Sequence, residues 1–203
     1  MTFPREINKI IGALPICEIV DFHRSGDCVY TIDNKYILKV SSNVKRLQNE
    51  HDKDDWLCKC IVAPKPVLFV VQNDTAYYLR ECLDGENLCS QKYLDRPLVL
   101  VNLLVQALQE LHSTKVDDKK YCLDANFDTL IHGDFCLPNI LVRDDKIVGY
   151  IDLGDAGIGD PWCDYAWCIW SLEYNLGTKE YTPLLLEKLG IQFDQEKFDK
   201  YTK

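Results

Sequence analysis

The chain has 203 residues, of which 47% are hydrophobic and 27% are charged, and its formal net charge is -9. This composition is typical of a globular protein with a buried core. The acidic balance argues against a nucleic-acid-binding protein and against binding to an anionic membrane surface, because both need a basic surface.

The N-terminal segment MTFPREINKI carries charged residues where a signal peptide has an apolar run. No stretch approaches the roughly 18 consecutive apolar residues of a membrane-spanning helix. The ten cysteines do not follow the spacing of a zinc site, so we expect reduced thiols that mostly fill the core. Together these features predict a cytoplasmic protein without a membrane partner.

Residues 1–82 are predicted to form a small N-terminal lobe, a β-sheet with one helix. The strands are short runs rich in β-branched and aromatic residues, separated by turn residues. The helix is predicted at 43–60, before Pro64 and Pro66. The predicted strands are 17–22, 28–32, 36–40, 66–71 and 76–82.

Residues 83–203 are predicted to form a mainly helical C-terminal lobe. Pro97 suits the first position of a helix that continues to Leu111 and is apolar nearly all round, which indicates a central buried helix. Two short strands follow, with a turn at Asp144-Asp145. The chain is therefore predicted to be an α+β protein. Further helices are predicted after Asp160-Pro161 and from Thr182-Pro183 to Gly190.

Three polar residues flank this hairpin in the sequence HGDFCLPNILVRDDKIVGYID. Asp134 and Asn139 precede its first strand, and Asp152 follows its second strand. Asn and Asp supply the hard oxygen ligands that Mg²⁺ prefers, and a carboxylate can accept the proton of an attacking hydroxyl. Turn chemistry explains each residue taken alone, since Asp and Asn bond their own backbone at strand ends. Taken together, they predict a base, Asp134, and two metal ligands, Asn139 and Asp152.

A phosphate clamp is predicted in the N-terminal lobe. Lys39 lies in an apolar strand, where an unpaired lysine is costly, and Glu50 lies in the following helix. We expect the two to pair and to hold the lysine against phosphates; a solvent-exposed lysine on an edge strand is the alternative. Ser25 and Gly26 form a turn whose N–H groups can meet a phosphate, or simply a hairpin turn.

The sequences HGDFCLPNILV, YIDLGDAG and DPWCDYAWC resemble those of the aminoglycoside phosphotransferases, and most closely the 3′-phosphotransferases among them. The resemblance extends to VQALQELHS, LDGENLC and YILKV, and so covers nearly the whole chain. It implies a protein-kinase-like fold with two lobes. It also implies transfer of the γ-phosphate of ATP or GTP, with Mg²⁺, to a hydroxyl group.

The resemblance implies roles for individual residues in phosphoryl transfer. It implies that Asp134 is the catalytic base and that Asn139 and Asp152 hold Mg²⁺. Lys39 contacts the nucleotide phosphates, with Glu50 as its partner.

The remaining implied roles concern the nucleotide and the catalytic loop. Ser25 and Gly26 correspond to the loop that covers the nucleotide phosphates. Glu81 and Cys82 correspond to the hinge, whose backbone contacts the nucleobase. Asp164 matches an aspartate that braces the catalytic loop. For His132, a bracing role is favoured over a catalytic one.

Three departures from the family concern the acceptor. The segment 114–131 is much shorter than its counterpart, which walls the acceptor site in the family. The chain stops at Lys203, before the carboxylate-bearing tail of the 3′-phosphotransferases, and Asp155 stands where many members have a basic residue. The residues that handle the nucleotide are present, whereas those that select the acceptor are reduced.

The sequence therefore predicts an ATP- or GTP-dependent kinase of a small hydroxyl-bearing molecule, with an aminoglycoside or another cationic amino sugar as candidate acceptor. The alternative is a catalytically weak nucleotide-binding module or sensor with a kinase-like fold. The intact set Asp134, Asn139, Asp152, Lys39 and Glu50 argues against that alternative. A protein kinase is disfavoured because HGD replaces HRD and no activation segment is recognisable.

Overall fold

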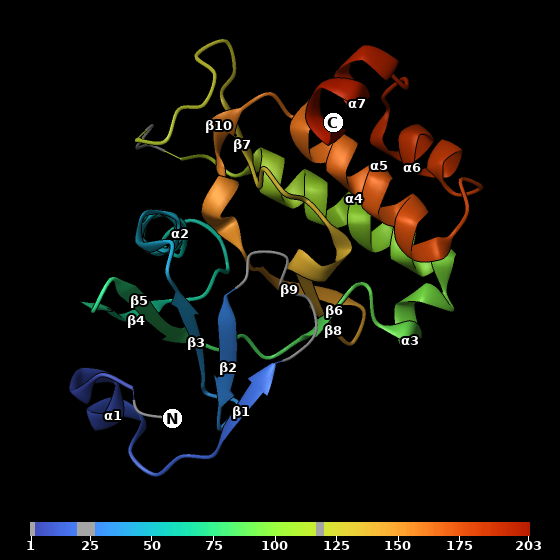
Figure 1. The fold of residues 1–203 in the computed structure, drawn as a ribbon. Helices are drawn as coiled ribbons and strands as arrows, with labels where there is room; N and C mark the ends of the chain where they lie inside the picture. The colour runs from blue at the N-terminus through green and yellow to red at the C-terminus, as the bar shows by residue number, and fades with distance from the viewer. Residues whose placement is uncertain (1–2, 20–26, 117–119) are drawn as a thin grey trace. The chain divides into compact units, whose positions relative to one another are not determined.

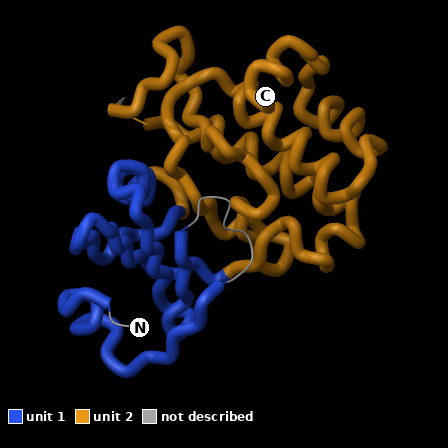
Figure 2. Tube along the Cα trace, in the orientation of Figure 1, with its two compact units in different colours: residues 1–59, 63–84 blue, residues 60–62, 85–203 orange. Residues whose placement is uncertain are grey.

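The computed structural model describes residues 3–19, 27–116 and 120–203. The chain divides into two compact units, which are coloured separately in Figure 2. Unit 1 comprises residues 1–59 and 63–84, and unit 2 comprises residues 60–62 and 85–203. The predicted division after residue 82 differs from this one by two residues and by the segment 60–62.

Unit 1 contains a five-stranded antiparallel sheet in the order β1-β2-β3-β5-β4. Two of its hairpins turn on Asp33-Asn34 and Asn73-Asp74, and all four residues have positive φ. Such φ values are those of the tight turns that match strand twist, and Asn and Asp tolerate them well. The strands are β1 (Ile16–Ile19), β2 (Cys28–Ile32), β3 (Tyr36–Ser41), β4 (Pro66–Gln72) and β5 (Thr75–Glu81).

The two helices of unit 1, α1 (Arg5–Ile11) and α2 (Val44–Leu57), pack against opposite faces of its sheet. Leu38 and Leu79 join the core under α1, whereas Tyr78, next along β5, packs with Leu47 of α2. This alternation follows from the two-residue period of a strand. The sequence predicts one helix here and does not predict α1, because seven residues with two buried isoleucines, Ile7 and Ile11, are too short for a clear helical pattern.

Unit 2 is mainly helical, and its long helix α4 (Pro97–Ser113) buries one face along its length, whereas Asn102, Gln106 and Glu110 are exposed. α4 lies beside α5 (Trp162–Leu176), as Figure 1 shows, and Pro97 begins it as predicted. Within the described ranges, no helix is long and apolar enough to cross a membrane. The other elements of unit 2 are β6 (Glu86–Asn87), α3 (Gln91–Leu94), β7 (Thr129–Ile131), η1 (Leu137–Asn139), β8 (Ile140–Arg143), β9 (Lys146–Tyr150), η2 (Leu153–Asp155), β10 (Gly157–Gly159), α6 (Thr182–Leu189) and α7 (Gln195–Thr202).

The hairpin β8–β9 turns at Asp144-Asp145, where both residues have positive φ. Its register pairs Ile140 with Tyr150, and the N–H of Ile151 donates to the Asn139 carbonyl at 3.0 Å. The residues before β8 and after β9 therefore lie at the same end of the hairpin. Asn139 and Asp152 are these residues.

Candidate active site

In unit 1, Lys39 and Glu50 form a buried ion pair. The Lys39 Nζ donates to the Glu50 Oε1 at 2.6 Å, and their side chains are 10% and 5% exposed. Lys39 is on the face of β3 that α2 covers, because the strand alternates and Leu38 faces the other way. A solvent-exposed lysine is thus excluded, and the ammonium is held rigidly by a carboxylate.

The same carboxylate oxygen has a second cationic partner that the sequence analysis missed. The Arg80 Nη1 donates to the Glu50 Oε1 at 2.8 Å and to the Asp54 Oδ2 at 3.0 Å. The Tyr78 hydroxyl donates to Asp54 as well, at 2.7 Å. Burial raises the pKa of the Asp54 carboxyl, although the Arg80 charge opposes that rise. Lys39 therefore belongs to a buried cluster of two cations and two carboxylates.

Glu81 ends β5 and Cys82 follows it, where the resemblance implies the hinge. The Glu81 N–H donates to the Lys65 carbonyl at 2.9 Å, and the Cys82 N–H donates to the Lys35 carbonyl at 2.8 Å. Both N–H groups therefore donate to carbonyls within unit 1. The carbonyl groups of Glu81 and Cys82 are the candidates for contact with the nucleobase. Ser25 and Gly26 lie outside the described residues.

In unit 2, the loop at His132-Gly133 is braced by a buried carboxylate from α5. The N–H of His132 donates to the Asp164 Oδ2 at 2.9 Å, and the N–H of Gly133 donates to Oδ1 at 2.8 Å. The His112 Nε2 of α4 also lies 2.9 Å from the Asp164 Oδ2. One carboxylate on α5 thus joins the loop to α4.

The His132 ring is buried and joins two loops. Its Nδ1 lies 3.3 Å from the Asp134 N–H, and its Nε2 lies 3.0 Å from the Ile151 carbonyl. The ring therefore accepts from one loop and donates to the other, which suits a bracing role. Gly133 has a φ of +83°, and a Cβ there would collide with the Asp155 carbonyl, so this position requires glycine.

Asp134 is held from two sides in its own loop. The Asn139 Nδ2 donates to the Asp134 Oδ2 at 2.9 Å and to its carbonyl at 2.9 Å. The Cys136 thiol donates to the Asp134 Oδ1 at 3.1 Å. The carboxylate is half-buried, so it is both held in place and reachable by a hydroxyl group.

Asn139 and Asp152 lie at one end of the β8–β9 hairpin. The two donor contacts of the Asn139 amide nitrogen turn its oxygen away from Asp134. Asp152 adopts a left-handed conformation with a φ of 61° at the turn into η2. The described residues contain no group of three or more His, Cys, Asp or Glu suited to a metal ion. An amide and a carboxylate, completed by phosphate oxygens and water, are ligands that Mg²⁺ accepts.

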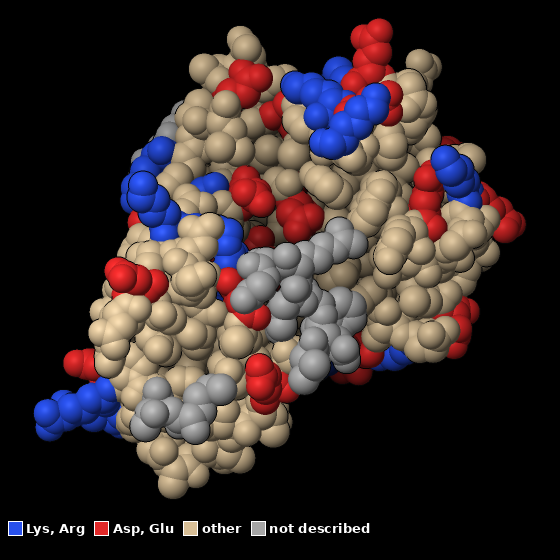
Figure 3. All heavy atoms as spheres, in the orientation of Figure 1, with Lys and Arg blue, Asp and Glu red and all other residues tan. Residues whose placement is uncertain are grey.

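Acidic side chains gather around Cys163 at the start of α5. Burial, together with the carboxylates of Asp164, Asp155, Asp160 and Asp134, raises the pKa of its thiol to about 12. The Tyr201 hydroxyl of α7 donates to the Asp160 Oδ2 at 3.0 Å. The carboxylates around Cys163 favour a positively charged ligand in this part of unit 2. Figure 3 shows the acidic side chains in red and the basic side chains in blue on one face of the molecule.

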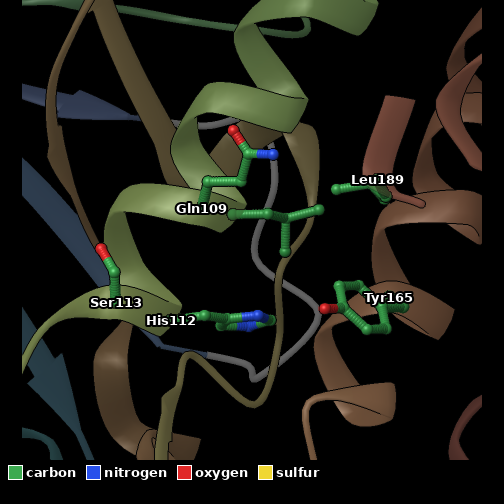
Figure 4. A pocket seen from close by; sticks show the side chains of 6 residues that line it. Gln109, His112, Ser113, Tyr165 and Leu189 are labelled. Carbon is green, nitrogen blue, oxygen red and sulfur yellow. The ribbon is translucent and has the colours of Figure 1, made fainter. Parts of the chain in front are cut away.

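A pocket of about 360 Å³ lies within unit 2, between α4, α5 and α6. In Figure 4 the His112 ring points across it toward Tyr165, with Leu189 on the far wall. The two rings are 5.3 Å apart in an edge-to-face arrangement. None of the predicted site residues lines this pocket. Its connection to the catalytic loop is the bond between His112 and Asp164.

The sequence offered usable signals for two of the missed residues. Asp54 follows Glu50 by one helical turn, so it presents a second acid on the same helix face. Arg80 is a cation within an apolar strand, as Lys39 is. The contacts of Cys136 and His112 had no comparable signal, because neither residue type indicates a partner by spacing alone.

Comparisons with known proteins identify similar sequences. A model of the phosphotransferase enzyme family matches residues 122–199. The chain is 28% identical over 234 residues to a probable aminoglycoside 3′-phosphotransferase of Lactococcus lactis, with 93% of this chain and 88% of that protein covered. It is 27% identical over 220 residues to an aminoglycoside 3′-phosphotransferase of Enterococcus faecalis, with 83% of each covered.

Solved structures show the same fold. An aminoglycoside phosphotransferase of Streptomyces rimosus matches with a TM-score of 0.79 and 18% identity, over 96% of this chain and 93% of that chain. That protein is also known in complex with ADP and streptomycin, with a TM-score of 0.78. An aminoglycoside 3′-phosphotransferase of type VIII matches with a TM-score of 0.71 and 20% identity, over 96% and 95%. The predicted α+β, protein-kinase-like fold is confirmed.

Proposed function

We propose that this chain, which belongs to the aminoglycoside phosphotransferase family, transfers the γ-phosphate of ATP or GTP to a hydroxyl group of a small molecule. One observation carries the proposal. Asp134 is held by Asn139, and Asn139 lies with Asp152 at the same end of the β8–β9 hairpin. This set provides a base and two oxygen ligands, which are the protein groups that phosphoryl transfer needs near the reacting atoms.

In the proposed reaction, Asp134 accepts the proton of the acceptor hydroxyl. The hydroxyl oxygen forms a bond to the γ-phosphorus while the bond from that phosphorus to the bridging oxygen breaks. The electron pair of the broken bond leaves on the nucleoside diphosphate. The contacts of both Asp134 oxygens hold the carboxylate in one orientation for this proton transfer.

Lys39 is assigned to bind the nucleotide phosphates. The main chain at Glu81 and Cys82 is assigned to bind the nucleobase. The Glu50 carboxylate orients the Lys39 ammonium within a buried cluster, so little reorganisation is needed when phosphates bind. Ser25 and Gly26 are assigned to the loop over the phosphates. Mg²⁺, when bound by Asn139 and Asp152, would neutralise charge on the phosphate oxygens.

The acceptor is proposed to be a cationic molecule of the amino-sugar class to which the aminoglycosides belong, with a small member of that class preferred over a large drug. The carboxylates of Asp155 and Asp160, which lie near Cys163 with Asp134, support a positively charged group beside the hydroxyl. The names of the Lactococcus and Enterococcus relatives support the same class. A cytoplasmic location belongs to this proposal as well, because ATP and GTP are supplied there and all ten cysteines are unpaired.

The test is a pair of substitutions with separate expected effects. Asp152→Ala should abolish Mg²⁺-dependent binding of ATP and GTP, whereas Asp134→Asn should keep binding and lower turnover by about 10²-fold or more. Binding is measured by titration with and without Mg²⁺, and turnover by release of nucleoside diphosphate. The control is Asp55→Ala. Asp55 is an exposed residue of α2 that forms an ion pair with Lys59. Normal Mg²⁺-dependent binding by the Asp152 variant would remove the metal assignment. Nucleotide binding without any turnover in the unaltered protein would favour the sensor alternative.

A further inference from the structure

We infer that Cys136 is a positioning residue for the catalytic base, a role that rests on the proposed function of Asp134. The thiol donates to the Asp134 Oδ1 at 3.1 Å, while Asn139 donates to the Asp134 Oδ2 at 2.9 Å. The two donors therefore hydrogen-bond to different oxygens of the Asp134 carboxylate. With Asn139 alone, the carboxylate could turn about its own axis and lose its direction toward the acceptor.

The thiol is suited to donate because it keeps its proton. Burial raises the pKa of the Cys136 thiol, and the nearby Asp134 charge raises it further. An S–H group is a weak donor, but its donation to an ionised carboxylate is strengthened by the charge. The contact therefore persists at neutral pH, when Asp134 must act as a base.

Cys136 is also supported from behind by α5. The Ser171 hydroxyl hydrogen-bonds the Cys136 thiol, and the same hydroxyl accepts the N–H of Leu137 at 3.0 Å. The Asn175 Nδ2 lies 3.2 Å from that hydroxyl and 2.7 Å from the Ser171 carbonyl. Ser171 is 1% exposed. A buried helix thus fixes the thiol, and the thiol fixes the carboxylate.

A second buried thiol beside the loop provides a matched control. The Cys163 Sγ lies 3.6 Å from the Gly133 carbonyl, so it touches the loop backbone. That hydrogen bond is made to the backbone and does not involve the Asp134 carboxylate. Replacing Cys163 with alanine removes a thiol on α5 that packs beside the same loop. It should leave turnover within about twofold of the unaltered protein, since the carboxylate keeps both donors.

The experiment measures kcat and KM for hydrolysis of Mg·ATP and Mg·GTP by four variants: Cys136→Ala, Cys136→Ser, Cys163→Ala and Asp134→Asn. Cys136→Ala should lower kcat about tenfold with KM for nucleotide unchanged within twofold, because it misdirects the base and leaves the nucleotide contacts. Cys136→Ser should recover kcat to within about threefold, because a hydroxyl also donates. Thermal unfolding of each variant shows whether folding is preserved.

The outcomes separate this inference from the proposed function. Normal kcat in Cys136→Ala, with Asp134→Asn inactive, would overturn the positioning role alone. Equal losses in Cys136→Ala and Cys136→Ser would overturn it too, since the thiol would then only fill space. Full activity of Asp134→Asn would instead overturn Asp134 as the base. If Cys136→Ala does not fold, the comparison of Cys136→Ser with the unaltered protein decides: a loss of tenfold or more with normal stability contradicts the donor role.

Discussion

At the scale of single residues, Glu50 holds two cations with one oxygen, and Asp54 lies one helical turn further on. Arg80 joins the two carboxylates, with its side chain 3% exposed. Removing one member of a buried ion cluster leaves an uncompensated charge, which costs more than replacing a whole pair. The stability of unit 1 should therefore depend on Arg80. Among the residues predicted to bind the nucleotide, Arg80 contacts Glu50.

We predict that Arg80→Met lowers the free energy of unfolding by about 3 kcal/mol or more. The double variant Arg80→Met/Asp54→Asn should recover at least half of that loss. The asparagine removes the unpaired charge and still accepts the Tyr78 hydroxyl. Urea denaturation of both variants gives the comparison. A cost below about 1 kcal/mol for the single variant would show that water or Lys39 compensates Glu50 and Asp54.

The limits of prediction at this scale follow from the same cluster. Lys39 and Glu50 could be paired in advance because a lysine within an apolar strand requires a partner on the adjacent helix. Arg80 lies on β5, thirty residues beyond Glu50 in sequence. Its contact depends on β5 lying next to β3 in the sheet, which the sequence does not specify.

At the scale of elements, the hairpins of unit 1 depend on residues that tolerate positive φ. Asn73 and Asp74 have φ values of 50° and 57° in the turn between β4 and β5. Asparagine followed by glycine is the preferred pair for such a turn. Glycine adopts positive φ without the steric cost that a Cβ brings.

We predict that Asp74→Gly raises the free energy of unfolding by about 0.5–1 kcal/mol, whereas Asp74→Ala lowers it by about 1 kcal/mol. Asp74 is exposed, so neither change alters the core. Thermal unfolding of the two variants at one position is the measurement. If alanine proves as stable as glycine, the turn relaxes to another type and positive φ is not required there.

Elements with strong local signals could be predicted, and those that depend on distant contacts could not. The turn at Asp144-Asp145 is where the sequence predicts it, because Asp marks turns by its own chemistry. The helix α1 was missed because its stability comes from packing on the sheet. In the catalytic loop, the residue types were readable, but the contacts of Asp164 and Ser171 come from α5, more than thirty residues away.

At the scale of the whole molecule, the chain is shorter than its relatives in the aligned region. The alignment with the Lactococcus protein extends over 234 positions, more than the 203 residues of this chain, so this chain lacks residues that the relative has. The short segment 114–131 is our candidate for that difference. A reduced acceptor wall would position a large acceptor less well and would admit water more easily.

We therefore predict measurable hydrolysis of ATP or GTP without an acceptor, and little stimulation by a kanamycin-type drug at millimolar concentration. The measurement is steady-state release of nucleoside diphosphate with and without the drug. Small amino sugars and amino alcohols tested in parallel give the comparison for a small cationic acceptor. Drug phosphorylation with kcat/KM in the ordinary enzyme range of about 10⁴–10⁸ M⁻¹s⁻¹ would show that the acceptor site is complete.

The double contact of Asp164 has a consequence for how the protein opens. The amides of His132 and Gly133 both end on a carboxylate that is fully buried on α5. Neither amide can exchange its hydrogen with solvent until its hydrogen bond to Asp164 breaks. Breaking either bond requires the loop to separate from α5. In native-state hydrogen exchange, the loop and α5 should therefore behave as one cooperative opening unit. The position of the loop that carries Asp134 therefore depends on the stability of α5, which begins at Trp162.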